Sequence, residues 1–284
     1  MTTLLSVRNV TVRFGGLTAV DDVSFDLADG ELLGLIGPNG AGKTTAMRSI
    51  TGVVRPSAGD VLLKGRSLHG LPVPARIRAG LALSQQLVRP LRGRSVLDNV
   101  TLAAGHAKTA SPLRALFHLD QRAEREKAMD MLRRVGIEQH ADAMPATLPL
   151  GVLKRLEMAR ALALEPRLLL LDEPLAGLNS AEARRLADTI AELNRQGLSI
   201  ILIEHNLSEV MRVCSRLVVL DNGRKIAEGE PRAVMDNPAV RQAYLGGEAA
   251  PAAGHPLKSV STLSPSPSPV AGEGSFERAG GAGI

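Results

Sequence analysis

The sequence predicts an α/β fold with a largely parallel central sheet. Three short apolar runs, at 32–36, 168–171 and 199–203, have the length of strands and lack the polar alternation of a half-exposed strand. Segments with helical character follow the first two runs. Strands that alternate with helices along a chain usually form a parallel sheet joined by crossovers, so this order predicts an α/β core.

The N-terminal elements have clear local signals. Apolar and polar residues alternate from the N-terminus to Phe14 without a continuous apolar stretch, so this segment is predicted to be a first strand and not a signal peptide. The run at 32–36 ends in a glycine-rich turn, and residues 43–50 are compatible with a helix. The predicted order at this point is therefore strand, loop, helix.

The next core helix is predicted from its capping pattern. The apolar run at 168–171 closes on Asp172, and Asn179 is followed three residues later by Glu182. An N-cap residue with Glu at the third helical position is typical of a capping box, so a helix is expected from there to about Arg195. The run at 199–203 then forms another buried strand.

The region from about 76 to 165 is predicted to be an inserted helical subdomain, because helical periodicity dominates there. Its clearest helix lies within 120–135, and Gly136 suits a helix C-terminus. The residues predicted for the apolar face of this helix are Ala128, Met131, Leu132 and Val135.

The last part of the chain combines a hairpin with a low-complexity tail. Apolar segments at 217–220 and 225–227 flank the turn Asp-Asn-Gly at 221–223, which is a typical hairpin signal. Residues 1–247 are expected to form one domain. Residues 248–284 are rich in Ala, Gly, Pro and Ser, and we expect them to be disordered.

Composition excludes several classes of protein. Hydrophobic residues make up 44% and charged residues 22% of the 284 residues, which is typical of a globular chain. Aromatic residues are only 2%, which argues against a platform that stacks single-stranded nucleic acid. The lone Cys214 cannot form an internal disulfide and suits a reducing compartment. The net charge of +5 decides little by itself, and apolar runs such as 168–171 are too short to cross a bilayer.

The strongest functional signal is GPNGAGKTT at 37–45, which fits the phosphate-binding pattern G-x-x-x-x-G-K-[ST] between a predicted strand and a predicted helix. Glycines let backbone N–H groups turn around phosphate oxygens, and the helix start adds its positive dipole end. Lys43 would contact the β- and γ-phosphates, and the Thr44 hydroxyl would ligate Mg²⁺. The alternative is a glycine turn beside a lysine. The nucleotide-binding candidates in this loop are Gly37, Pro38, Asn39, Gly40, Ala41, Gly42, Lys43, Thr44 and Thr45.

The second signal is LLLLDEP at 168–174, an apolar strand that delivers two adjacent carboxylates at its carboxyl end. Because neighbouring side chains of an extended segment diverge, Asp172 and Glu173 are expected to have different roles. Asp172 is predicted to face Mg²⁺ and Glu173 the attacking water. Alone, the pattern could equally mark a plain strand end, but the phosphate-binding loop upstream favours the catalytic interpretation.

The motifs occur in the order that they have in nucleotide-binding subunits of ABC transporters: the phosphate-binding loop, LLLLDEP, the loop AGLN and the segment LIEHN. The chain resembles that family over roughly 4–247. The segments FGGLTAVDDVSF and AYLG, with the pairing of AGLN and LIEHN, resemble more narrowly the importers of branched-chain and other hydrophobic amino acids.

The resemblance implies a P-loop NTPase core of the RecA-like kind, with a largely parallel sheet, an antiparallel β subdomain and an inserted α-helical subdomain. It implies ATP and Mg²⁺ as cofactors. The implied partners are a second ABC ATPase subunit, identical or different, two transmembrane permease subunits and, indirectly, a solute-binding protein; no nucleic acid is expected. The implied location is peripheral, on the cytoplasmic face of the inner (plasma) membrane.

Four further site residues follow from the resemblance. Gln86, chosen over Gln85, matches the glutamine that senses Mg²⁺, and His205 matches the histidine that hydrogen-bonds the γ-phosphate and helps to orient the water. Phe14 matches an aromatic residue that stacks on adenine; the alternative is a core phenylalanine. Asn179 stands where the family more often has Asp, in the loop that crosses to the partner subunit, and keeps hydrogen bonding without charge.

The signature segment departs from the family pattern. The usual L-S-G-G-Q aligns with LPLGV at 148–152, which keeps only Leu148 and Gly151. In the family, a serine hydroxyl and backbone N–H groups of this segment contact the γ-phosphate on the opposite subunit. Pro149 supplies neither group. We expect either an adequate variant or a weakened site, and unequal sites in a heterodimer with a regular partner.

The sequence therefore predicts the ATP-binding and hydrolysing subunit of an importer for branched-chain or hydrophobic amino acids or related small solutes. One alternative is the ATPase of an exporter, for example of lipopolysaccharide. Another is a regulatory subunit with weak hydrolysis, which LPLGV and Asn179 suggest. A ribosome-associated or nucleic-acid-associated ABC ATPase is disfavoured, because such chains generally hold two cassettes or an inserted coiled coil.

Overall fold

Two β-sheets organise the chain. The structure, a computed structural model, describes residues 2–84, 90–105 and 121–245. The strands within these ranges are β1 (Thr3–Phe14), β2 (Leu17–Ala28), β3 (Leu32–Ile36), β4 (Ala58–Leu63), β5 (Arg66–Ser67), β6 (Leu81–Ser84), β7 (Leu168–Asp172), β8 (Ser199–Ile203), β9 (Arg216–Asp221) and β10 (Arg224–Gly229). In the described part of the chain they form a six-stranded sheet of order β10-β9-β3-β8-β7-β6 and a four-stranded sheet of order β2-β1-β4-β5.

The six-stranded sheet confirms the predicted parallel core. β3 runs parallel to its neighbours β8 and β9, and β7 runs parallel to β8 and β6. Every residue of β3, β7 and β8 is buried, which explains why these strands are apolar without alternation. β10 pairs antiparallel with β9, and the turn residues Asn222 and Gly223 both have positive φ, as the predicted Asn-Gly hairpin requires.

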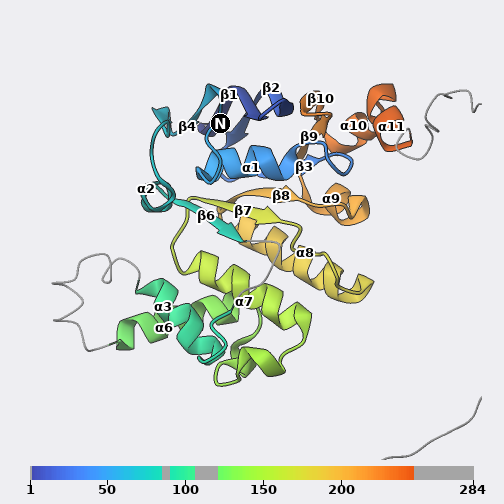
Figure 1. Cartoon of the computed structure of the whole chain (residues 1–284). Coiled ribbons are helices and arrows are strands. Elements are labelled where there is room, and N and C mark those ends of the chain that lie inside the picture. The colour runs from blue at the N-terminus through green and yellow to red at the C-terminus, as the bar shows by residue number, and fades with distance from the viewer. Residues whose placement is uncertain (1, 85–89, 106–120, 246–284) are drawn as a thin grey trace, which may run out of the picture. The chain divides into compact units, whose positions relative to one another are not determined.

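The four-stranded sheet is antiparallel and packs on helix α1 (Lys43–Thr51). In Figure 1, α1 lies between this sheet and the strands β3 and β8. Leu33 and Leu35 of β3 belong to the core cluster on the α1 side, whereas Leu32 and Ile36 belong to the cluster on the opposite side. Both faces of β3 are therefore covered, and the glycine-rich turn at its end starts from a rigid strand.

The remaining helices around the core are α2 (Val73–Arg78), α8 (Ser180–Arg195), α9 (Leu207–Val213), α10 (Pro231–Asp236) and α11 (Pro238–Leu245). The predicted capping box starts α8: the side chain of Asn179 accepts the N–H of Glu182, and the side chain of Glu182 accepts the N–H of Asn179. No helix within the described ranges has both the length and the apolar character needed to span a membrane.

Helices dominate between β6 and β7. They are α3 (Val96–Ala104), α6 (Arg122–Arg134) and α7 (Leu150–Leu162), with 3₁₀ turns at Glu138–His140 and Pro145–Thr147. The predicted apolar face of α6 is buried, and Gly136 follows with a φ of 70°. The expected helical range 76–165 also contains strand β6, because residues 81–84, of which the first three are apolar, pair with β7 and are too few to show a periodicity of their own. The boundary at 247 and the tail 248–284 lie outside the described residues.

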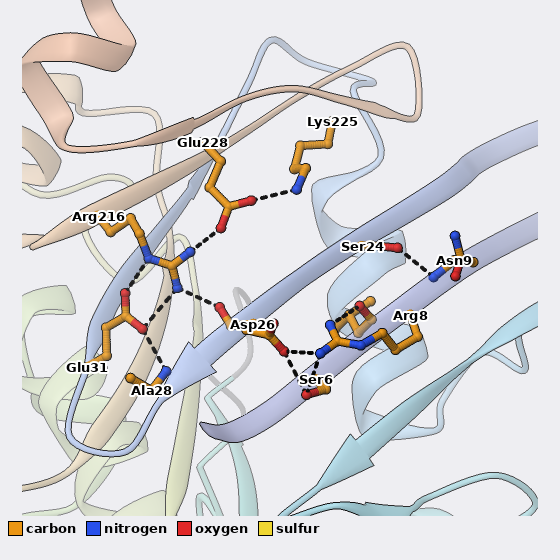
Figure 2. Close-up of polar contacts among 11 residues, drawn as sticks. Ser6, Arg8, Asn9, Ser24, Asp26, Ala28, Glu31, Arg216, Lys225 and Glu228 are labelled. Carbon is orange, nitrogen blue, oxygen red and sulfur yellow. Dashed lines mark hydrogen bonds and ion pairs between the residues drawn. The ribbon is translucent and has the colours of Figure 1, made fainter. Parts of the chain in front are cut away.

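A polar network joins the two sheets (Figure 2). Arg216, at the start of β9, donates to the two carboxylate oxygens of Glu31 at 2.7 and 3.0 Å. It also donates to the backbone carbonyl of Asp26 in β2 at 2.6 Å and pairs with Glu228 in β10. Hydrogen bonds to Glu31 raise the pKa of Arg216, against the effect of burial. One guanidinium thus ties the antiparallel sheet to the parallel one.

Replacing Arg216 by methionine is expected to lower the free energy of unfolding by about 2 kcal/mol, because the Glu31 carboxylate, 11% exposed, loses a two-pronged charged partner. Arg8→Met is the matched control. Its ion pair with Asp26 is exposed at 45% and 46%, so a loss below about 1 kcal/mol is expected. Urea unfolding of both variants measures the difference, and equal losses would contradict the bridging role of Arg216.

Candidate functional site

The glycine-rich turn at 37–45 needs glycine for steric reasons. Gly37 and Gly42 have φ values of 148° and 97°, which side chains rarely adopt. A Cβ atom at Gly37 would lie 2.0 Å from the carbonyl oxygen of Leu220, and one at Gly42 would lie 2.4 Å from the carbonyl oxygen of Ala19. The turn therefore curves tightly against both neighbours only with glycine at these positions.

Lys43 begins α1, and its side chain reaches back to the turn. Its Nζ donates to the carbonyl oxygens of Gly37 at 2.8 Å and Pro38 at 2.9 Å. Burial lowers the pKa of Lys43, while the charges of Glu173 and Asp172 oppose this shift. No side chain of the described residues caps the start of α1. The ammonium group and the first N–H groups of the helix together suit an anion such as a phosphate.

Asp172, the last residue of β7, is buried and has an oxygen that fits a cation. Its Oδ1 has no hydrogen-bond partner among the described residues. Burial and the charge of Glu173 raise its pKa, and the Thr44 hydroxyl and Arg48 are among the groups that oppose the shift. A carboxylate oxygen beside a hydroxyl suits Mg²⁺, which takes few protein ligands and completes its shell with phosphate oxygens and water. Gln86, the other predicted metal contact, lies outside the described residues.

Glu173, the residue after Asp172, pairs with His205. Its Oε1 lies 2.7 Å from Nε2 of His205, which follows β8. The φ of Glu173 is 50°, a left-handed conformation that is unusual for this residue type. The two carboxylates have different neighbours, His205 for Glu173 and Thr44 for Asp172, and their different roles stay a prediction. A carboxylate joined to an imidazole can accept, hold and return a proton.

One hollow of about 420 Å³ collects most of the predicted nucleotide contacts. It is lined by Phe14, Leu17, Ala19, residues 39–45, Glu173 and His205. Phe14 is 51% exposed, so its interpretation as a core phenylalanine is wrong. An exposed ring at the wall of this hollow is available to stack on a flat ligand, and its contact with adenine stays a prediction.

The signature segment lies at a different hollow. Pro149 is the N-cap of α7, and its carbonyl accepts the N–H groups of Val152 and Leu153. Pro149 and Gly151 line a hollow of about 360 Å³ that shares no residue with the first. Neither Leu148 nor Asn179 lines the first hollow, and Asn179 is engaged in capping α8. The fold therefore does not bring the two groups of predicted nucleotide contacts together within one chain.

Two buried charged residues beside the site were missed from the sequence. Lys154 is 7% exposed and donates to the carbonyl of Glu173. Glu204 is 3% exposed and accepts the N–H groups of Leu175 and His205. Glu204 stands next to His205 in LIEHN, so a charged residue directly after an apolar strand could have indicated it. Nothing in the helical pattern around Lys154 distinguishes it from a surface lysine.

Comparison with known families gives two matches. The sequence model described as ABC transporter matches residues 20–176. The model described as branched-chain amino acid ATP-binding cassette transporter matches residues 224–250.

Curated relatives and solved structures cover most of the chain. The high-affinity branched-chain amino acid transport ATP-binding protein LivG of Salmonella typhimurium is 40% identical over 250 residues, covering 86% of this chain and 98% of that protein. The corresponding BraF of Pseudomonas aeruginosa is 37% identical with the same coverage, and the lipopolysaccharide export ATP-binding protein LptB of Escherichia coli is 34% identical over 85% of this chain and 97% of that protein. The crystal structure of an ABC transporter cassette in its ADP conformation is 30% identical, with a TM-score of 0.77, over 87% of this chain and 100% of that one.

Proposed function

This chain belongs to the ABC transporter family, and on that premise we propose that it is the ATP-binding and hydrolysing subunit of an importer for branched-chain or other hydrophobic amino acids. The observation that carries the proposal is the hollow in which the glycine turn and Lys43 face the Glu173–His205 pair. The match at 224–250 and the names of the LivG and BraF relatives support amino acids as the transported class.

In this proposal the triphosphate lies on the turn at 37–45, where Lys43 exchanges its carbonyl contacts for phosphate oxygens. Thr44 and Asp172 would hold Mg²⁺, whose charge stabilises the negative charge that develops on the terminal phosphoryl group. Glu173 accepts a proton from the attacking water. The oxygen of that water bonds to the γ-phosphorus, and the bond between the γ-phosphorus and the bridging oxygen of the β-phosphate breaks. His205 holds Glu173 through Nε2 and contacts the γ-phosphate.

A complete site needs a second subunit in this proposal. The glycine-rich turn at 37–45, the P-loop, and the signature segment at 148–152 line separate hollows in one chain. ATP would therefore lie between the P-loop of one subunit and the signature segment of another. The other partners are two permease subunits and, indirectly, a solute-binding protein. The chain would work as a peripheral subunit at the cytoplasmic face of the inner membrane. Gln86 would contact Mg²⁺, and the segment beside Gln86 would face the permease.

The test reconstitutes the full-length chain with its permeases in proteoliposomes and measures ATP hydrolysis together with uptake of radiolabelled leucine. ATP-dependent leucine uptake is expected. ATP hydrolysis that is stimulated by lipopolysaccharide and not by leucine would favour the exporter, which the LptB relatives make the specific alternative. ATP binding without turnover would favour the regulatory subunit. Absence of MgATP binding would overturn the assignment as an ATPase.

The two ATP sites of a mixed dimer are expected to be unequal. With a partner that has a serine in its signature, Lys43→Ala should remove most of the ATPase activity, and the matching change in the partner should remove little. The reason is that Pro149 supplies neither a hydroxyl nor an N–H, a loss of about 1.5–3 kcal/mol per charge-assisted bond. Single-site turnover of both mixed dimers measures this, and equal losses would contradict it.

Pro149→Ser is expected to strengthen the weaker site by about tenfold or more. The backbone of Pro149, with φ of −60° and ψ of 155°, already has the extended conformation that a serine N-cap adopts, so serine fits without rearrangement. Turnover at that site alone, with the other P-loop disabled, is the measurement. An unchanged rate would mean that LPLGV is an adequate variant.

A further inference from the structure

The backbone that carries Glu173 is held by several contacts. The N–H of Glu173 donates to the carbonyl of Ile203 at 2.9 Å, and its own carbonyl accepts the N–H of Ala176 at 3.2 Å and the Nζ of Lys154 at 3.1 Å. A non-glycine residue keeps a φ of 50° only where its surroundings fix it. The position of the Glu173 carboxylate therefore depends on these contacts.

Glu204 forms the anionic half of this support. Its Oε1 accepts the N–H of Leu175 at 2.6 Å, and its Oε2 accepts the N–H of His205 at 3.2 Å. One buried carboxylate therefore binds the turn that follows Glu173 and the turn that carries His205. Burial raises the pKa of Glu204, and backbone hydrogen bonds from Leu175 and His205 oppose the shift.

Lys154 forms the cationic half and comes from a different part of the fold. It lies on α7, the helix that starts at the signature segment. Burial lowers the pKa of Lys154, and the negative charges of Glu204, Glu173 and Asp172 oppose this shift. It contacts a backbone carbonyl behind the site, and it does not line the hollow of the P-loop.

We propose that Lys154 is a positioning residue for hydrolysis, which ties α7 to the carbonyl of Glu173 and so sets the place of the Glu173 carboxylate. The inference rests on the proposed function, in which the start of α7 contacts the nucleotide of the partner subunit. A shift of α7 on that contact moves the Lys154 side chain and, through it, the turn of Glu173. Binding of nucleotide to the partner subunit is thereby linked to the position of the Glu173 carboxylate in this chain.

The test compares kcat and KM for MgATP in the full-length chain, in the assembly that hydrolyses ATP. For Lys154→Met, kcat is expected to fall by about 10- to 100-fold, since a small displacement of a catalytic group costs this much, and KM is expected to change less than about threefold. Lys154→Arg, which keeps a charged donor, should recover most of kcat. Rates are expressed per MgADP-binding site, so loss of folded protein does not count as loss of catalysis.

Arg160→Met is the matched control on the same helix. Arg160 lies near the end of α7, and its Nη1 donates to the Glu157 carboxylate at 2.9 Å. Arg160 lines neither the hollow of the glycine turn nor that of the signature segment, so kcat per site should not change. Lys154→Gln is the second variant if methionine prevents folding.

A double variant separates positioning from general stability. If Lys154 acts through Glu173, adding Lys154→Met to Glu173→Gln should not slow single-turnover hydrolysis further. Where the wild-type chain hydrolyses ATP, any of three results would overturn the inference: further slowing in the double variant, a kcat for Lys154→Met within about twofold of wild type, or no recovery of kcat in Lys154→Arg. A wild-type chain without ATP hydrolysis would overturn the proposed function and this inference with it.

Discussion

Replacing Glu173 by glutamine is expected to lower ATP hydrolysis by at least about a hundredfold while ATP still binds. Glutamine keeps the size of the side chain and an oxygen for His205 at the 2.7 Å contact, but it cannot accept the proton of the attacking water. Because ATP would lie between two subunits in the proposed function, ATP that binds without being hydrolysed should hold the subunits together, and dimers should accumulate. Single-turnover hydrolysis and size-exclusion chromatography with MgATP measure the two effects.

Glu138→Gln is the control for this variant, because Glu138 is an exposed carboxylate on a 3₁₀ turn and does not line the hollow. It should hydrolyse ATP at the wild-type rate. Near-normal turnover of Glu173→Gln would show that the base is another group. A Glu173→Gln variant that no longer binds MgATP would instead place Glu173 among the binding contacts.

Replacing Lys43 by alanine is expected to weaken MgATP binding by about 10- to 100-fold and to abolish hydrolysis at physiological ATP. The substitution removes the ammonium group of a lysine that is only 5% exposed. Because water has little access to this group, its attraction to a phosphate is only weakly screened in the wild type. The positive end of α1 remains, so weak binding should persist. Titration with MgATP followed by calorimetry measures the affinity.

Lys64→Ala serves as the control, because Lys64 is exposed and lies outside the hollow. Its affinity should match that of the wild type. An unchanged affinity in Lys43→Ala would mean that the turn at 37–45 does not hold the triphosphate, and the proposed function would lose its principal support. Thermal unfolding without nucleotide checks that both variants remain folded.

Most of the fold could be predicted because its signals are local. The capping box of Asn179 and Glu182, the hairpin turn at Asn222 and Gly223, and the apolar strands each depend on neighbours in sequence. The strand β6 within the expected helical region was missed for the opposite reason. Its four residues become a strand only through pairing with β7, which is 87 residues away at the first paired position, Leu81 with Leu168 (168 − 81).

The candidate site divides in the same way. The residues of the loop at 37–45 could be named from spacing and glycine content, because the pattern itself encodes a turn around an anion. The support from Lys154 and Glu204 could not be predicted, because a lysine in a helix and a glutamate after a strand acquire their contacts only when α7, β7 and β8 are brought together.

By itself the sequence determined the phosphate-binding turn, the two carboxylates at the end of β7 and the family to which they belong. Only the tertiary structure decided that Glu173 lies 2.7 Å from a histidine 32 residues later, that Phe14 is exposed at the wall of the hollow, and that Lys154 lies behind the base. The physical reason is that turns and caps are fixed by interactions within a few residues. The meeting of side chains from separate strands depends on strand order and burial, which no short segment specifies.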